Sequence, residues 1–192
     1  EDAILYAYRH EIPIVATKEK VYSIDDNLWG RAIECGEMED PWRVPPPGDW
    51  SMTKPSATEP RDLEISFVEG VPTAVDGEEL GLVELIEKLN TVVGSYGWGR
   101  IDMVENRRVG IKSRETYECP AALALIMAHT DLESITLERD LAREKSRLEP
   151  RYAELIYDGL WFSPLRAAFD AFVEESQQLV TGDVRLRLSP GQ

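Results

Sequence analysis

The chain has very few of the residues that build metal centres. Its only cysteines are Cys35 and Cys119, and its only histidines are His10 and His129. None of them stands at the spacing of a zinc site, so we expect no metal and two buried free thiols. The sequence has no apolar run of about 18 residues, so we expect no membrane-spanning helix. It has no basic and apolar leader either, so we expect no secretory signal and a cytoplasmic location.

Basic residues are scarce relative to acidic ones. The chain carries 21 lysines and arginines against 36 aspartates and glutamates, a formal net charge of −15. Such a charge repels the phosphate backbone of nucleic acids and anionic membrane surfaces, so we expect neither partner. It does not argue against a local pocket for a small phosphorylated ligand. With 192 residues, 43% of them hydrophobic, the chain is large enough for one folded domain with a core.

Sequence motifs of self-contained catalysis are also missing. Neither a P-loop nor a dinucleotide-binding glycine motif is present, and no Gly-x-Ser-x-Gly elbow occurs. The glycine-rich segment 94–100 follows a predicted helix and precedes a predicted strand, which is the reverse of the order that binds phosphate. We therefore interpret it as a connecting loop.

Hydrophobic periodicity predicts an α+β fold, with helices packed on an antiparallel sheet. Residues 62–68 alternate between apolar and polar side chains, and Asp76-Gly77 marks a hairpin turn after them. Apolar residues at helical spacing predict a helix over 82–94, and Ser163 before a proline marks the start of a later helix. The other predicted elements are strands at 100–105, 108–111 and 182–189 and helices at 120–140, 151–158 and 164–179.

Residues 1–61 do not follow the pattern of strands and helices expected for the rest of the chain. Residues 1–10 have apolar side chains at helical spacing, and residues 12–16 resemble a short strand. A helix followed by a strand is half of an α/β unit, so we expect residues 1–20 to be the tail of a larger domain. We interpret residues 22–36 as a turn followed by a short helical or irregular segment. Residues 37–61 are rich in proline and predict a long ordered loop or linker.

The densest group of charges lies in "GRIDMVENRRVGIKSRETYECPAA", residues 99–122, around a predicted turn. By the two-residue period of a strand, Glu105 shares a face with Met103, and we expect that face to point toward the core. A half-buried carboxylate at the end of such a row lies at the edge of the sheet and needs a cationic partner.

Two interpretations of Glu105 stay open on the residues alone. One is a structural salt bridge to Arg107 or Arg114 at the end of the strand. The other is a pocket for the ammonium group of an amino acid, in which Tyr117 contributes its hydroxyl.

Four segments resemble the argininosuccinate synthase family, in the order of that family and across nearly the whole chain. They are "YSIDDNLWGRAIECG", "GRIDMVENRRVGIKSRETYECPAA", "TLERD" and "YAELIYDGLWFSPLRAAFDAF". Only the proline-rich loop matches loosely. The resemblance implies that residues 21–192 form the synthetase or multimerisation domain of this family, and that residues 1–20 are the tail of its nucleotide-binding domain.

The resemblance implies a carbon–nitrogen ligase of arginine biosynthesis and the urea cycle. In this family the ureido oxygen of citrulline attacks the α-phosphate of ATP and releases pyrophosphate, and the aspartate amine then displaces AMP. The resemblance also implies that ATP, with Mg²⁺, is bound mainly by the missing nucleotide-binding domain, and that the full-length enzyme is a homotetramer. We therefore expect the isolated chain to bind no cofactor and to be inactive.

Three citrulline contacts of the family fall on matching residues, which are Ser23, Glu105 and Tyr117. The last two lie 12 positions apart, as in the family. A further serine of the family falls on Ala32, which has no hydroxyl, so one contact is weakened. The resemblance implies that Glu105 binds the ammonium group of citrulline, while Ser23 and Tyr117 offer donors to its carboxylate. It assigns no catalytic acid or base to this chain.

A non-catalytic interpretation also stays open. The chain can be an α+β assembly or regulatory module that keeps the fold of the family without its chemistry. The lack of a nucleotide-binding loop favours this interpretation for the chain taken alone.

Overall fold

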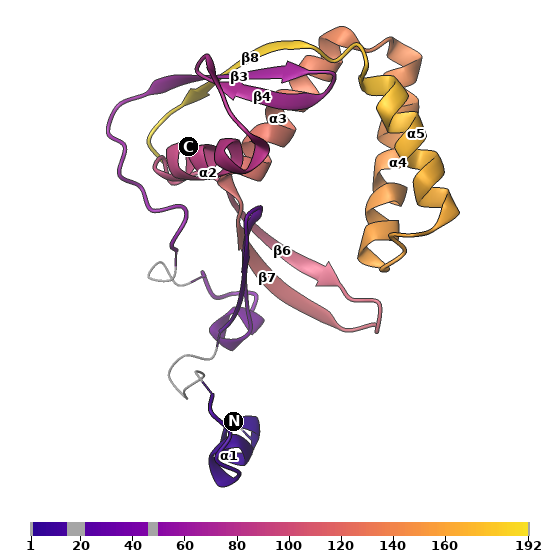
Figure 1. Cartoon of the computed structure of the whole chain (residues 1–192). Helices are drawn as coiled ribbons and strands as arrows, with labels where there is room; N and C mark the ends of the chain where they lie inside the picture. Colours follow the sequence, from indigo (N-terminus) through magenta and orange to yellow (C-terminus); the bar gives the residue numbers. More distant parts are fainter. Residues whose placement is uncertain (1, 15–21, 46–49, 192) are drawn as a thin grey trace.

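The computed structural model describes residues 2–14, 22–45 and 50–191, and it has the predicted α+β fold (Figure 1). Five α-helices, one short 3-10 helix and eight strands lie in the described residues, and the strands form two antiparallel sheets where the sequence suggested one. None of the helices in this described part is long and apolar enough to cross a membrane.

The first sheet holds the main hydrophobic core. Its strands have the order β5-β4-β3-β8, and helices α2 and α3 pack together beside it (Figure 1). Leu63, Ile65 and Phe67 of β3 point into this core, where they meet Leu89 of α2 and Leu132 of α3. The elements are β3 (Arg61–Val68), β4 (Val71–Val75), β5 (Glu78–Glu79), α2 (Leu82–Gly94), α3 (Pro120–Thr136) and β8 (Gly182–Leu188).

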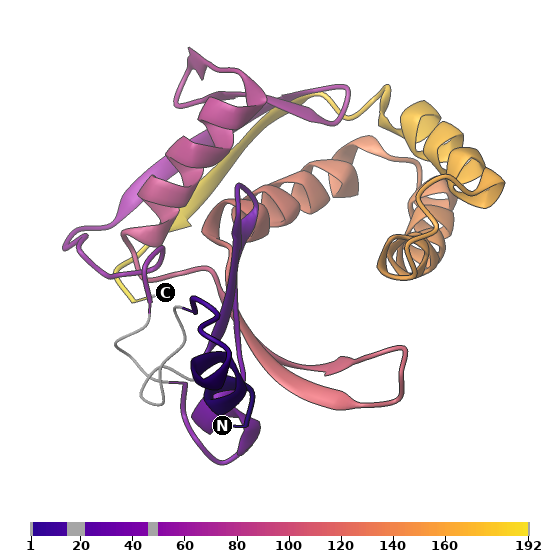
Figure 2. The ribbon, with the colours of Figure 1, turned by 60° about the horizontal axis from the view of Figure 1, so that its bottom comes forward.

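The second sheet carries the charged cluster found in the sequence. Its strands have the order β1-β2-β7-β6, so β1 and β6 are the outer strands. Figure 2 shows β6 and β7 curving away from the first sheet, with the turn between them toward the ends of α4 and α5. The elements are β1 (Ser23–Asn27), β2 (Gly30–Glu34), β6 (Arg100–Asn106), β7 (Lys112–Glu118), α4 (Arg139–Tyr157) and α5 (Pro164–Gln177).

One face of the second sheet covers a small core of its own. Ile33 of β2 packs with Met38, which lies in the short 3-10 helix η1 (Gly36–Glu39), and with Trp50. The buried carboxylate of Glu118 accepts hydrogen bonds from the backbone N–H groups of residues 51–53 on this side. These bonds hold residues 51–53 of the proline-rich loop against this face of the sheet. The small core and the loop therefore cover one face of the sheet and not the other.

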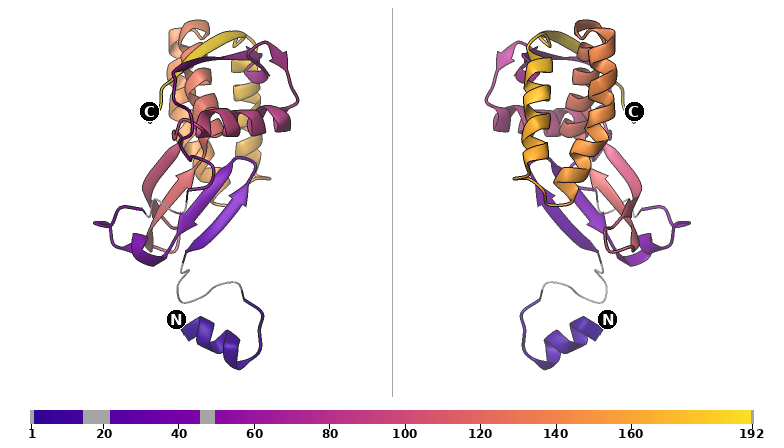
Figure 3. Two further views of the ribbon diagram at one scale, coloured as in Figure 1. Left: turned by 90° about the vertical axis from the view of Figure 1, so that its left-hand side faces the viewer. Right: turned by 90° about the vertical axis from the view of Figure 1, so that its right-hand side faces the viewer.

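The helices α4 and α5 form an antiparallel pair beside the rest of the molecule (Figure 3). Ser163 caps α5 as predicted, because its Oγ accepts a hydrogen bond from the backbone N–H of Arg166 at 3.2 Å. The carboxylate of Glu138 caps α4 in the same way. The helix predicted to begin at residue 151 is the second half of α4, which continues through Pro150.

The N-terminal helix is α1 (Asp2–Arg9), which lies apart from both sheets (Figures 1 and 3). Residues 12–14 of the segment expected to be a strand have no strand structure, and residues 15–21 lie outside the described part. Cys35 and Cys119 are free thiols, and both are half-buried where we expected them buried.

Two predictions for the second sheet are wrong. Residues 22–36 contain the hairpin of β1 and β2, not a helical or irregular segment. The strand expected at 108–111 is the turn after β6, and the second strand of the pair is β7 at Lys112–Glu118. Both errors have one cause: β1 and β7 consist almost wholly of polar residues, so hydrophobic alternation does not mark them.

Candidate ligand-binding site

The register of the second sheet places the four predicted positions on one face. Ala32 pairs directly with Tyr117, and Glu105 pairs with Ser113. Residues paired directly across strands, and residues two apart along one strand, point to the same face. The same rule adds Ser23, which pairs with Glu34 on β2. We call this surface the site face; it is opposite to the small core.

Glu105 lies near the end of β6 and is held from two sides. Its Oε2 accepts a hydrogen bond from Nε of Arg107 at 3.0 Å, and its Oε1 accepts one from the hydroxyl of Tyr157 at 2.8 Å. The side chain is 20% exposed. The predicted salt bridge to Arg107 is therefore present, while Arg114 pairs with Asp102 on the other face. The expectation of a core-facing row is wrong, because Met103 is exposed.

Negative charge exceeds positive charge around Arg107. Its guanidinium forms ion pairs with the carboxylates of Glu34, Glu105 and Glu115, and its Nε also donates to Ser113 at 2.9 Å. The hydrogen bond to Glu115 and the charge of Glu34 raise the pKa of Arg107, so it stays protonated. Three carboxylates around one guanidinium leave a net negative surface, which favours a cationic group such as an ammonium.

The hydroxyl of Tyr117 donates its proton to the carboxylate of Glu115. Burial raises the pKa of Tyr117, and the bond to Glu115 raises it further, so the hydroxyl stays neutral. Because its proton is already directed to Glu115, the hydroxyl has lone pairs for an incoming N–H donor. This differs from the expectation that Tyr117 donates to a ligand carboxylate.

Ser23 and Ala32 lie farther along the same face. Ser23 is exposed on the outer strand β1, and Ala32 is half-buried beside Tyr117. Strands are spaced about 4.8 Å apart, so Ser23 and Glu105 stand on outer strands separated by roughly 14 Å. An elongated molecule suits that separation, with its cationic group at Glu105 and its other end toward Ser23.

Three residues of this site were missed in the sequence. Alternation along β7 could have found Glu115, which stands two places before Tyr117. Glu34 could be placed on the site face only once the β1–β2 hairpin was known. Tyr157 is 52 residues from Glu105, so no local sequence signal marks either residue. Among the described residues, no group of three or more His, Cys, Asp or Glu side chains is arranged to hold a metal ion.

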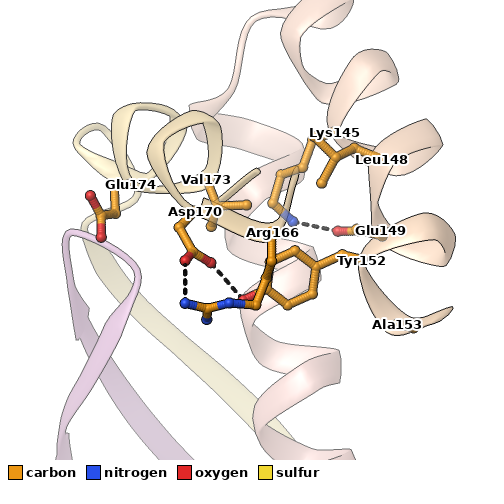
Figure 4. A pocket seen from close by; sticks show the side chains of 9 residues that line it. All are labelled: Lys145, Leu148, Glu149, Tyr152, Ala153, Arg166, Asp170, Val173 and Glu174. Atoms are coloured by element: carbon orange, nitrogen blue, oxygen red, sulfur yellow. Dashed lines mark hydrogen bonds and ion pairs between the residues drawn. The ribbon is translucent and has the colours of Figure 1, made fainter. Parts of the chain in front are cut away.

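Two pockets lie outside the centre of the site face. One of about 520 Å³ lies at the β6–β7 turn and shares Glu34, Arg107 and Ser113 with the charged cluster. Another of about 600 Å³ lies between α4 and α5, and its described lining includes none of the predicted site residues (Figure 4). Inside that second pocket, Lys145 pairs with Glu149, and both belong to α4.

Comparison with known proteins gives one consistent family. The family described as "Arginosuccinate synthase C-terminal domain" matches residues 22–192. The chain is 55% identical to the argininosuccinate synthase of Rubrobacter xylanophilus, covering 99% of this chain and 47% of that protein. It is 53% identical to the argininosuccinate synthase of Brevibacillus brevis, covering 100% of this chain and 46% of that protein. The chain thus spans about half the length of the curated relatives it matches.

Proposed function

The chain belongs to the argininosuccinate synthase family, and from this premise we propose that it supplies the citrulline-binding half of an ATP-dependent ligase. The full-length protein joins citrulline to aspartate and releases AMP and pyrophosphate. Residues 21–192 form its synthetase and multimerisation domain, and residues 1–20 are the tail of its nucleotide-binding domain.

The observation that carries this proposal is the excess of negative charge beside Tyr117 on the site face. Citrulline is a zwitterion with a neutral ureido group, so its ammonium group needs an anion. Glu105 has both oxygens hydrogen-bonded and sits with Glu34 and Glu115 around a single arginine. A hydrogen bond between an ammonium group and such a carboxylate contributes about 1.5–3 kcal/mol.

The remaining contacts follow from the same face. The hydroxyl of Tyr117 accepts an N–H group of citrulline, because its own proton is directed to Glu115. Ser23 stands on the outer strand β1, roughly 14 Å across the sheet from β6, so it faces the ureido end of citrulline. The carboxylate shares a carbon with the ammonium group and lies near Glu105, which differs from the expectation that Ser23 binds it. Ala32, on the neighbouring strand β2, supplies no hydroxyl to the ligand. These contacts place the ureido oxygen for attack on the α-phosphate, so this chain contributes by positioning rather than by proton transfer.

The charge of the site face also bears on where ATP binds. Three carboxylates around Arg107 repel a triphosphate, so they do not suit the phosphates of ATP. The family resemblance implies that ATP with its Mg²⁺ is held mainly by the nucleotide-binding domain of the full-length protein, and the charge of the site face agrees with this. That protein works in the cytoplasm as a homotetramer assembled through the domain described here.

The test is an assay of the purified full-length protein with citrulline, aspartate and Mg-ATP. We expect argininosuccinate to form, with one AMP and one pyrophosphate released per product. The isolated 192-residue chain, assayed beside it, should form none. A folded full-length protein that forms no product under these conditions would contradict the proposal and favour a non-catalytic module.

A further inference from the structure

We propose that Tyr157 is a positioning residue that orients Glu105 toward the ammonium group of the substrate. The inference rests on the proposed function and extends it to helix α4, whose last residues lie in the family-like segment 152–172 but received no site residue from the resemblance. Tyr157 is the last residue of α4, and its hydroxyl donates to Oε1 of Glu105 at 2.8 Å.

The contact belongs to a junction between a helix end and a hairpin. Next to Tyr157, the carboxylate of Asp158 forms an ion pair with Arg108 in the turn after β6. Two consecutive residues at the end of α4 therefore hold two residues at the end of the β6–β7 hairpin. Figures 1 and 2 show this hairpin projecting from the second sheet, toward the end of the α4–α5 pair.

The two oxygens of Glu105 receive their donors from different elements. Arg107, in the hairpin itself, donates to Oε2, and Tyr157, on α4, donates to Oε1. Two donors from different directions fix the plane of the carboxylate, which one donor alone leaves free to rotate. A carboxylate oxygen accepts about two hydrogen bonds. The Ser113 hydroxyl lies 3.4 Å from Oε2 and fills its second position, so the lone pair for a substrate N–H group is on Oε1, the oxygen that Tyr157 holds.

The hydroxyl of Tyr157 suits this role because it stays neutral. The hydrogen bond to Glu105 raises the pKa of Tyr157, so the proton remains on the hydroxyl at neutral pH. The ring itself is half-exposed and contributes little to the core. Removal of the hydroxyl should therefore disturb the orientation of Glu105 and leave the fold intact.

The test compares two substitutions on one helix of the full-length protein. Tyr157→Phe should raise the KM for citrulline about 3- to 10-fold, with kcat and the KM values for ATP and aspartate changed by less than about 2-fold. Tyr152→Phe is the matched control, since its hydroxyl donates to Asp170 of α5 and not to the site face. The control should leave the KM for citrulline unchanged.

A double-mutant cycle separates this inference from the proposed function. In a Glu105→Ala background, Tyr157→Phe should raise the KM for citrulline by less than about 2-fold further, because the carboxylate that Tyr157 positions is gone.

If Glu105→Ala raises the KM for citrulline but Tyr157→Phe does not, the role of Tyr157 is wrong and the proposed site stands. An equal rise in both backgrounds would also overturn the role of Tyr157. If Glu105→Ala has no effect, the proposed site itself is wrong.

Discussion

Glutamates of β7 serve the two faces of the second sheet in different ways. Glu115 lies on the site face and shares Arg107 with two other carboxylates. Glu118 lies on the opposite face, is fully buried and is paired with Arg31 at 3.0 Å. Its other oxygen accepts from the backbone N–H and the hydroxyl of Thr53, at 2.9 and 2.7 Å. A single strand thus carries one carboxylate for the site and another for stability.

Replacement of Glu118 by glutamine should destabilise the chain in a pH-dependent way. Burial alone raises the pKa of Glu118, but hydrogen bonds from Ser51, Thr53 and Arg31 outweigh burial and hold it below the ordinary value. A carboxylate with a lowered pKa in the folded state stabilises above its unfolded pKa of about 4.3, and this stabilisation is lost as the pH falls through the folded pKa.

Urea unfolding of both proteins checks this prediction. At pH 7 the Glu118→Gln variant should have a free energy of unfolding lower by about 3–5 kcal/mol, because one partner of a buried network is lost. The difference between the two proteins should shrink as the pH falls below about 4.3. A difference that stays constant down to pH 3 would contradict the role of the charge.

Restoring the family hydroxyl at Ala32 should strengthen citrulline binding. Ala32 pairs with Tyr117 on the site face, so a serine there places a hydroxyl beside the proposed substrate. One added hydrogen bond contributes about 0.5–1.5 kcal/mol, so the KM for citrulline of full-length Ala32→Ser should fall roughly 2- to 10-fold. Ala74→Ser, in the first sheet, is the control. An unchanged or higher KM for Ala32→Ser would place the ligand away from this position.

At the scale of elements, Gly99 lets the start of β6 pack closely against the start of α3. Gly99 precedes β6 with a φ of 109°, and a Cβ there would lie 2.4 Å from Cα of Pro120, the first residue of α3. Alanine cannot fit so close to backbone without shifting the strand or the helix. The site face thus depends on a junction that has no contact with the site itself.

Gly99→Ala should therefore lower the melting temperature of the chain much more than Gly77→Ala. Gly77 also has a positive φ, of 76°, but a Cβ at that position would meet no heavy atom within 4 Å, so only backbone strain acts there. That strain costs about 1 kcal/mol, whereas Gly99→Ala adds a steric clash. Thermal melts of both variants compare the two costs, and equal shifts would contradict the importance of close packing at Gly99.

The elements that the sequence predicts well are those with an apolar face of their own. The strand β3 and the helices α2 and α5 were marked by periodicity or by an N-cap, and all three are confirmed. The hairpin of β1 and β2 was missed because β1 reads Ser-Ile-Asp-Asp-Asn and is wholly exposed. The hairpin is instead defined by the pairing of β1 with β2 and by its turn. In the turn, the Asn27 side chain accepts hydrogen bonds from two backbone N–H groups.

The site was predictable only in part, because local sequence patterns do not encode contacts between distant elements. Alternation alone placed Glu105 at a sheet edge beside arginines, and Arg107 is indeed its partner. The choice of Ser23 and Tyr117 as site residues came from the family resemblance and not from periodicity. The contact of Tyr157 with Glu105 joins elements far apart in sequence, and such contacts follow from tertiary packing, which local patterns do not encode.

At the scale of the whole molecule, the two sheets have separate hydrophobic cores. The main core joins β3 and β8 to α2 and α3, while the small core lies under β2. The site face is on the side of the second sheet away from that small core, and α4 touches it at Tyr157. The proposed function requires this face to meet the nucleotide-binding half of the full-length ligase.

The most direct test of the proposed site is the KM for citrulline of full-length Glu105→Ala, measured beside Glu64→Ala. Glu64 is an exposed glutamate of the first sheet and serves as the control. Loss of a charged hydrogen bond of about 1.5–3 kcal/mol predicts a rise of roughly 10- to 150-fold for Glu105→Ala. The KM values for ATP and aspartate should stay within about 2-fold of the parent protein, since Glu105 contacts neither in the proposal. A KM for citrulline equal to that of Glu64→Ala would contradict the proposed site.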